Sequence, residues 1–423
     1  MDLEKKVLEK ISPTISEKIE IDRIVKLFEK RIKEEVEKID INAEPLLVGS
    51  VAKGTFLKNP DIDIFILFPK NLEREKLEKY GLQIGFAVLP NGETKYAEHP
   101  YVCGKYSGYN IDIVPCYKID KASERLSAVD RTPFHTKYIV EKMPEEKKSD
   151  VLLLKQFLKG IGVYGAEAMV QGFSGYLCEL LVLKYGSFRN TLKNAKYDEV
   201  FFFPDPVDKN RNVASALLKK NILTFLHASK AYLAKPSIKF FFPKKLKPIS
   251  IKELEKKIKE RKTKIVLVEF QKPKISEDIL YPQLRKGLKA ISRVCEEYGF
   301  KIFKSSFFVN HNIFYLFEFE TFSLPKIRKH FGPPVLHRNA DKFLKKWKGK
   351  AYVEDENWAV EIFREYTEPE EFIKSKIKEL NLGKNLNEFV SKGFKVLSGK
   401  KLLKKNYSYQ LTKFFDTRFR WEY

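Results

Sequence analysis

Residues 61–68 read DIDIFILF, and they follow a Val-Gly-Ser turn at residues 48–50. In an extended strand, side chains two positions apart share a face, so Asp61 and Asp63 lie about 6–7 Å apart along one side. The isoleucines between them face the other side, where a hydrophobic core can cover them. Two adjacent carboxylates are unfavourable unless cations neutralise them. The stretch therefore predicts a divalent-metal site beside a phosphate-binding turn, which favours phosphoryl or nucleotidyl transfer.

A third carboxylate for this site is predicted at Asp112, within YNIDIVP at residues 109–115. That stretch alternates apolar and polar residues, as a neighbouring strand would. Two metal ions about 3.5–4 Å apart need such a third ligand, and Asp112 is expected to bind the ion that activates the attacking hydroxyl. An isolated Asp-x-Asp pattern is more often a solvated strand edge, so the prediction depends on the turn and on Asp112 as well.

The turn at Gly49 is expected to direct backbone N–H groups of a helix start toward the β- and γ-phosphates of a nucleotide. Ser50 can add a hydroxyl and Lys53 a positive charge. The alternative is an ordinary strand-to-helix turn without a ligand.

Composition narrows the class of partner. The chain has 423 residues with 80 Lys and Arg against 56 Asp and Glu, a net charge of +24. Such an excess favours nucleic acid first and an anionic membrane second, although basic surfaces are also common in Lys-rich proteomes. The four cysteines contain no Cys-x-x-Cys pair, so neither zinc nor a redox motif is indicated. Without a signal-peptide pattern or a membrane-length apolar run, we expect a soluble, cytoplasmic protein.

Hydrophobic periodicity predicts an α+β multidomain protein with three parts. These are a mixed-sheet head at 1–143, a helical central domain at 144–260 and an α+β body at 261–423 with an inserted tail at about 325–368. The β-α-β-β order of the body resembles an RNA-recognition or ferredoxin-like module. The elements expected in the head are a helix at 16–39, strands at 46–48 and 61–68, a helix at 73–79, and strands at 83–89, 94–103 and 109–114, with a hairpin turn at Asn91-Gly92. In the central part, we expect helices that start at Pro144, near residue 174 and near Val213, and a further helix that spans 221–233. In the last third, we expect a strand at 265–270, a helix at 280–298, strands at 300–309 and 312–319, a break at Gly332-Pro333-Pro334, a helix at 340–347 and a hairpin at 351–363.

Several further motifs make a resemblance specific. The carboxylates and the turn are similar to those of the nucleotidyltransferase superfamily that includes DNA polymerase β, and imply its palm-like head. The later motifs resemble the archaeal, class I, CCA-adding tRNA nucleotidyltransferases, in matching order from about residue 5 to the C-terminus. These motifs are RTPFHT at 131–136, GFSGYLCE at 172–179, DPVD with RNVA at 205–214, GPP at 332–334 and YVED with a following Trp at 352–358.

The resemblance implies a function and its residues. It implies that CTP and ATP are added to the 3′ end of tRNA with two Mg²⁺ ions, and that the C-terminal parts grip the acceptor and TΨC arms. The family's metal carboxylates match Asp61, Asp63 and Asp112, and its triphosphate turn matches Gly49, Ser50 and Lys53. Its further nucleotide contacts match His135, Lys155, Tyr164 and Arg211. At two positions this sequence departs from the family's usual residue: Asp61 stands where Glu is frequent, and Lys53 where Arg is frequent. Each replacement keeps the charge of the side chain but changes its shape.

Other readings stay open at this point. A poly(A) polymerase or an oligoadenylate-type synthetase would share the catalytic residues, and a non-catalytic RNA-binding protein could retain the fold. His99 is a further candidate site residue, while Asp205 and Asp208 could cap a helix instead of reading a base. Whether the chain forms a homodimer is not determined by the sequence.

Overall fold

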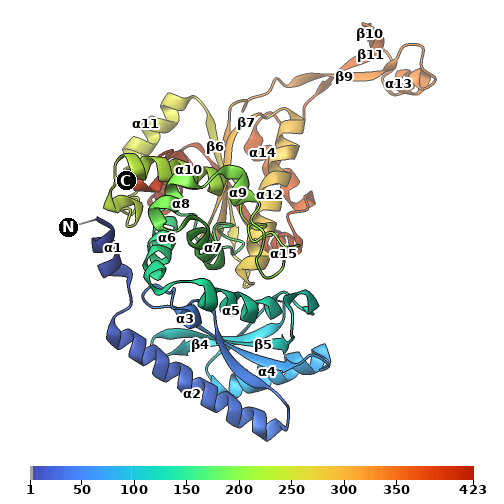
Figure 1. Cartoon of the computed structure of the whole chain (residues 1–423). Helices are drawn as coiled ribbons and strands as arrows, with labels where there is room; N and C mark the ends of the chain where they lie inside the picture. Colours follow the sequence, from blue (N-terminus) through green and yellow to red (C-terminus); the bar gives the residue numbers. More distant parts are fainter. Residues whose placement is uncertain (1–2, 97) are drawn as a thin grey trace. The chain divides into compact units, whose positions relative to one another are not determined.

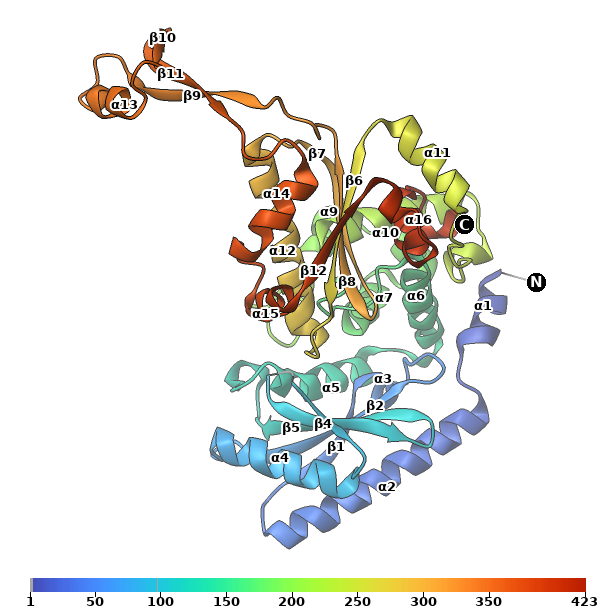
Figure 2. The ribbon, with the colours of Figure 1, turned by 180° about the vertical axis from the view of Figure 1, so that it is seen from behind.

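The computed structural model describes residues 3–96 and 98–423, which form two compact units (Figures 1 and 2). The first unit is Met1–Lys245 together with Arg418–Tyr423, and the second is Leu246–Thr417. Residues 418–423 therefore belong to the first unit, whereas the predicted three-part division places them in the C-terminal body. The division of the first unit near residue 143 stays a prediction. Within the described residues, no helix is long and apolar enough to cross a membrane.

The first unit contains a mixed sheet. Its strands are β1 (Glu44–Val48), β2 (Asp61–Pro69), β3 (Glu93–Tyr96), β4 (Pro100–Tyr106) and β5 (Tyr109–Lys118). They lie in the order β1-β2-β5-β4-β3, where β2 and β5 are parallel and the other neighbours antiparallel. The helices around the sheet are α2 (Ile15–Ile39), α3 (Gly49–Lys53), α4 (Arg74–Val88) and α5 (Thr132–Lys142). The predicted mixed sheet is confirmed.

The two faces of this sheet have different roles. On one face, α2 and α4 cover the isoleucines of β2 and β5, all fully buried (Figure 2). On the other face lie α3 and α5. Because residues alternate along a strand, burying Ile62 and Ile64 under α2 and α4 directs Asp61 and Asp63 to the face of α3 and α5.

The strand expected at 83–89 is wrong, since α4 continues as a helix to Val88. Two glycines explain why a helix fits there: a Cβ at Gly81 would lie 2.6 Å from Pro115 Cβ, and one at Gly85 would lie 2.6 Å from Val102 Cγ2. The helix therefore packs closer to the sheet than a larger residue would allow. Asn91-Gly92 joins α4 to β3 and is not a hairpin turn. The tight hairpin is Ser107-Gly108, with the two positive φ angles, 48° and 87°, that a type I′ turn requires.

Helices make up the rest of the first unit and share one large core with Trp421. They are α1 (Leu3–Ile11), α6 (Lys148–Ile161), α7 (Gly175–Tyr185), α8 (Phe188–Asn194), α9 (Tyr197–Phe201) and α10 (Lys219–Ala234). The helix expected from Pro144 begins instead at Lys148, after a 3₁₀ turn at Glu145–Lys147. No helix starts at Val213, which pairs its backbone with Phe203. The short α8 and α9 were not predicted.

The second unit is built on a four-stranded antiparallel sheet in the order β12-β6-β8-β7. This confirms the predicted ferredoxin-like body. Its strands are β6 (Lys264–Gln271), β7 (Ile302–Val309), β8 (Asn312–Phe319) and β12 (Phe394–Ser398), and its helices are α11 (Ile251–Arg261), α12 (Glu277–Tyr298), α14 (Pro369–Lys376), α15 (Lys384–Lys392) and α16 (Ser408–Phe415). One face packs against α12, α14 and α15, while residues of α11 and α16 cover the other (Figure 2). Neither face of this sheet is therefore open for stacking of RNA bases.

A small three-stranded sheet projects from this body, ordered β10-β11-β9 (Figure 1). It consists of β9 (Ile327–Pro334), α13 (Ala340–Lys346), β10 (Tyr352–Glu354) and β11 (Asn357–Phe363). The break expected at Gly332-Pro333-Pro334 falls at the end of β9, a strand that the sequence did not predict. The prolines are tolerated since β9 is an edge strand, where a missing N–H leaves no partner unsatisfied.

Candidate active site

The three predicted carboxylates share one face of the sheet. In the parallel pair of β2 and β5, Asp63 lies directly opposite Asp112, and Asp61 lies two positions before Asp63. The amide of Asn110 donates a hydrogen bond of 2.8 Å to Asp61 Oδ1. Cys103 of β4 lies on the other side of Asp112. The structure thus brings together the acidic residues that the sequence placed in two separate strands.

The Gly49 turn lies against this acidic group. Gly49 has a φ of 72°, and a Cβ atom there would lie 2.2 Å from Asp63 Oδ2. Val48, the residue before it, pairs with Asp63 across β1 and β2. Ser50 follows as the second residue of the five-residue α3. The turn and the carboxylates are therefore in direct contact, which their sequence spacing alone did not establish.

Burial and mutual repulsion make the carboxylates ready to take up a cation. Burial raises the pKa of Asp63 to about 7, and the charges of Asp112 and Asp61 act in the same direction. Burial raises the pKa of Asp112 to about 6, with Lys95 opposing and Asp61 adding to the shift. Hard divalent ions prefer such oxygen ligands and would offset their repulsion. Within residues 3–96 and 98–423, no three acidic, His or Cys side chains already lie close enough to enclose an ion, and like charges oppose that approach.

Lys53 and Lys155 meet at one buried carboxylate, that of Glu179 on α7. Lys53 Nζ lies 2.6 Å from Glu179 Oε2, and Lys155 Nζ lies 3.3 Å from Oε1. Thr55 donates a hydrogen bond of 2.5 Å to Oε1, and its carbonyl accepts one of 2.9 Å from Lys155. Glu179 has no exposed surface, and burial would raise its pKa, yet the two lysines hold that pKa below its ordinary value.

Tyr164 lies beside the same group. A Cβ at Gly175 would lie 3.2 Å from Tyr164 Oη and 3.5 Å from Lys155 Nζ, so both polar ends converge on the start of α7. Lys159 Nζ lies 5.3 Å from the centre of the Tyr164 ring. Burial raises the pKa of Tyr164, which keeps its hydroxyl protonated and able to donate.

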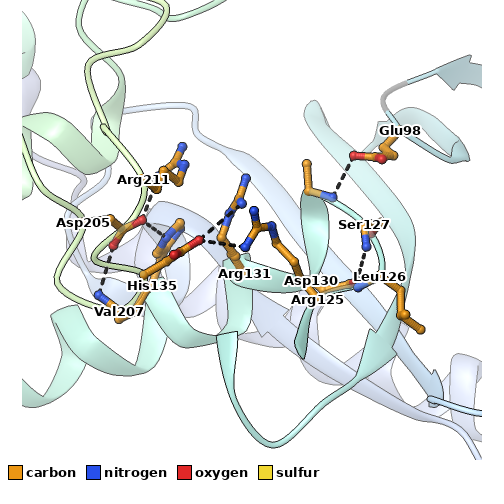
Figure 3. A network of polar contacts seen from close by, with 12 residues as sticks. Glu98, Arg125, Leu126, Ser127, Asp130, Arg131, His135, Asp205, Val207 and Arg211 are labelled. Atoms are coloured by element: carbon orange, nitrogen blue, oxygen red, sulfur yellow. Dashed lines mark hydrogen bonds and ion pairs between the residues drawn. The ribbon is translucent and has the colours of Figure 1, made fainter. Parts of the chain in front are cut away.

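His135 and Arg211 form a second group around Asp205 (Figure 3). The His135 ring stacks on Tyr176 with 4.1 Å between centroids. Lys53 links the groups, because its Nζ lies 5.7 Å from the centre of the Tyr176 ring and its charge acts on both Asp63 and His135. The predicted site residues thus form a connected set, in which Arg211 reaches the others through Asp205.

Sequence reasoning did not assign Glu179 or Asp205 as the carboxylates that hold these side chains. Glu179 ends the motif at 172–179, and the signal for its role is that a Glu in an otherwise apolar helix needs a buried cation. Asp205 does accept the backbone N–H of Val207, as a turn-forming Asp would, but it also binds three side chains. His99 lies apart from them, buried with its Nδ1 3.3 Å from Glu78 Oε1.

Three family models match the chain. A nucleotidyltransferase domain matches residues 29–135. The second domain of tRNA nucleotidyltransferases matches residues 149–198 and 194–242. The C-terminal domain of the CCA-adding enzyme matches residues 261–399.

Curated relatives from archaea match over most of their length. The CCA-adding enzyme of Thermoplasma volcanium is 41% identical, covering 82% of this chain and 83% of that protein. The CCA-adding enzyme of Archaeoglobus fulgidus is 40% identical, covering 86% and 88%. That of Haloarcula marismortui is 33% identical, covering 98% of both chains.

Proposed function

Since the chain belongs to the family of CCA-adding enzymes, we propose that it builds and repairs the 3′-terminal CCA of tRNA without a template. It takes CTP and ATP and releases pyrophosphate as the tRNA 3′-hydroxyl attacks the α-phosphorus. Its assignment to the cytoplasm, expected from the sequence, is part of this proposal. The observation that supports it most is the pairing of Asp63 with Asp112, against which Gly49 closes.

Asp61, Asp63 and Asp112 would hold two Mg²⁺ ions, which when bound lower the pKa of the attacking hydroxyl and neutralise the leaving pyrophosphate. The donor set suits this role because all three groups are carboxylates on one face of the sheet. The raised pKa values of Asp63 and Asp112 mean that a nearby positive charge would stabilise their ionised forms. Asn110 orients the Asp61 carboxylate from the side.

The triphosphate would lie against the Gly49 turn, where the Ser50 hydroxyl and backbone N–H groups can donate to it. Lys53 and Lys155 supply positive charge from opposite sides of Glu179, and their two charges against one leave a net attraction for phosphate. The protonated hydroxyl of Tyr164 donates beside them.

His135 and Arg211 would contact the sugar or base of the incoming nucleotide. Both are only partly covered, with side-chain exposures of 13% and 29%, so a ligand can reach them. The Asp205 carboxylate, which contacts both side chains, fixes their orientation.

The second unit would bind the acceptor and TΨC arms through phosphates and A-form shape. Because helices cover both faces of its four-stranded sheet, binding would use exposed cations elsewhere. The four lysines Lys345, Lys346, Lys348 and Lys350, all exposed at the end of α13 and just beyond it, suit this role.

The test is a sequencing assay on tRNA that lacks its 3′ CCA, supplied with each nucleoside triphosphate separately and in mixtures. The expected product carries C, C and A in that order and depends on Mg²⁺. Replacing Asp63 or Asp112 with Ala should abolish incorporation while a gel-shift assay still detects tRNA binding. An A-only tail or a 2′–5′ linkage would contradict the proposal and indicate one of the related polymerases. Retained turnover in either variant would remove the metal assignment.

A further inference from the structure

The buried carboxylate of Asp205 holds two predicted nucleotide contacts at once (Figure 3). Its Oδ2 lies 2.8 Å from His135 Nε2 and accepts a hydrogen bond of 2.8 Å from Arg211 Nη1. Its Oδ1 accepts bonds of 3.1 Å from both the Tyr176 hydroxyl and the Val207 amide. Asp205 has no exposed surface. Groups from α5, from α7 and from its own loop therefore satisfy both oxygens.

This geometry fixes the protonation of His135. Burial by itself would raise the pKa of Asp205, but hydrogen bonds from His135, Arg211 and Val207 lower it to about 2. The carboxylate is ionised at neutral pH and can only accept hydrogen bonds. His135 Nε2 therefore donates, and a neutral ring in this tautomer keeps Nδ1 as an acceptor. Burial lowers the pKa of His135, which favours the neutral ring at pH 7.

We propose that Asp205 is a positioning residue of the nucleotide site, which holds His135 as the Nε2–H tautomer and fixes the plane of the Arg211 guanidinium. Nδ1 then accepts a hydrogen bond from a hydroxyl or amino group of the nucleotide, and both CTP and ATP have such donors. A guanidinium fixed in one plane can use its donor fork without first losing rotamer freedom. This inference depends on the proposed function of His135 and Arg211 as nucleotide contacts.

The neighbouring Asp208 offers a matched control. It lies in the same loop and is also buried, but its side chain binds Arg125 at 2.9 Å and Arg131 at 3.6 Å. Replacing it with Asn therefore disturbs the ion pairs of a buried carboxylate in the same loop while leaving the partners of His135 in place.

The charges around the His135 ring set the sign of the expected pH effect. The groups that face it are Asp205 and Arg211 on the loop, Lys53 on α3 and the Tyr176 hydroxyl on α7. Asp205 favours a proton on the ring, while Arg211 and Lys53 oppose it. Removing the negative charge at position 205 therefore makes His135 harder to protonate.

The first experiment measures KM and kcat for CTP and ATP across pH in the full-length enzyme with tRNA lacking CCA. We expect Asp205→Asn to raise KM for both nucleotides by about tenfold or more, and Asp208→Asn to leave KM near the wild-type value. At saturating Mg²⁺, which keeps Asp63 and Asp112 ionised, the acid-side fall of kcat/KM should move to lower pH in Asp205→Asn alone. Equal KM changes and equal acid limbs in the two variants would overturn the proposal.

A measurement on the wild-type protein decides the matter even if Asp205→Asn does not fold. Ring-nitrogen NMR of ¹⁵N-histidine-labelled enzyme, assigned with His135→Gln, should show His135 with its proton on Nε2 at pH 8. A proton on Nδ1 would overturn the proposal, because Asp205 would then not set the tautomer.

His135→Gln also separates this inference from the proposed function. If that variant leaves KM for CTP and ATP unchanged, the nucleotide-contact role of His135 is wrong, and this inference is overturned with it. If it raises KM while Asp205→Asn does not, the contact stands and the positioning role of Asp205 alone is overturned.

Discussion

At the scale of single residues, position 49 requires glycine for two independent reasons. Its φ of 72° is unfavourable for any residue with a Cβ, and that Cβ would lie 2.2 Å from Asp63 Oδ2. Gly108 shares only the first reason, because its φ is 87° but nothing lies within 4 Å of its Cβ position.

We expect Gly49→Ala to lower nucleotide incorporation by about 100-fold or more, since it displaces the Asp63 carboxylate from its place at the site. Gly108→Ala should lose only about 1 kcal/mol of folding free energy to backbone strain and keep its activity. Incorporation assays and chemical denaturation of both variants measure these effects. Similar activities in the two variants would show that contact with Asp63 does not matter.

Asp63 also predicts a pH dependence of stability. Its pKa is raised from 3.8 to about 7, so between these values the folded protein binds a proton that the unfolded chain has lost. This contribution to stability is complete below the lower pKa and is lost as pH rises toward 7. In EDTA, Asp63→Asn should therefore be more stable than wild type at pH 8 by about 4 kcal/mol, with a smaller gain at pH 5.

Denaturation curves at the two pH values, with and without Mg²⁺, measure this difference. Added Mg²⁺ should stabilise the wild type more than the variant, because binding to the folded state favours it. A variant that is less stable than wild type at pH 8 in EDTA would contradict the burial and repulsion assigned to Asp63.

At the scale of secondary-structure elements, Glu179 of α7 joins α3 and α6 through their buried lysines. Breaking a buried ion pair by removing one partner is costly, because the other charge remains without compensation. Glu179→Gln keeps the shape of the side chain but leaves Lys53 and Lys155 without their carboxylate. We expect a loss of about 3–5 kcal/mol in the free energy of unfolding.

The exposed pair of Lys184 and Glu199 provides the control, with Nζ 2.5 Å from Oε2 and side-chain exposures of 40% and 36%. Glu199→Gln should cost much less stability than Glu179→Gln, because water screens the exposed pair. Urea denaturation of both variants gives the comparison. Equal losses would mean that burial adds nothing to the role of Glu179.

At the scale of the whole molecule, the net charge of +24 provides a general attraction for tRNA. We expect replacement of Lys345, Lys346, Lys348 and Lys350 by Gln to weaken tRNA binding and to flatten its dependence on salt, because fewer counterions are released from the RNA. Filter binding at several salt concentrations measures the slope.

The matched control removes the same formal charge from α11, by replacing Lys252, Lys256, Lys257 and Lys259 with Gln. Two of these lysines have acidic neighbours one helical turn away, since Lys256 lies 3.8 Å from Glu260 and Lys259 lies 3.0 Å from Glu255. Their loss should change the salt slope less. If the two sets of variants behave alike, the lysines near α13 act only through net charge.

Several features follow from local sequence alone. The alternation in residues 61–68 is enough to assign a strand with one acidic and one apolar face, because side chains alternate with a period of two. The same pattern around Asp112 predicts a second strand, which the structure pairs with the first. The resemblance of the later motifs indicated the family, which the archaeal relatives confirm.

Tertiary structure decided what distant parts of the chain bring to the site. Lys53 and Glu179 are 126 positions apart, and His135 and Asp205 are 70 apart, so no local pattern relates them. Packing also overrode local preference in α4, where Gly81 and Gly85 let a helix approach the sheet at a place expected to be a strand. By itself the sequence predicted three carboxylates on two strands and the strand face on which they lie, because backbone periodicity is local. Only the folded chain decided which buried charges pair, because a buried charge must find its partner in space rather than along the chain.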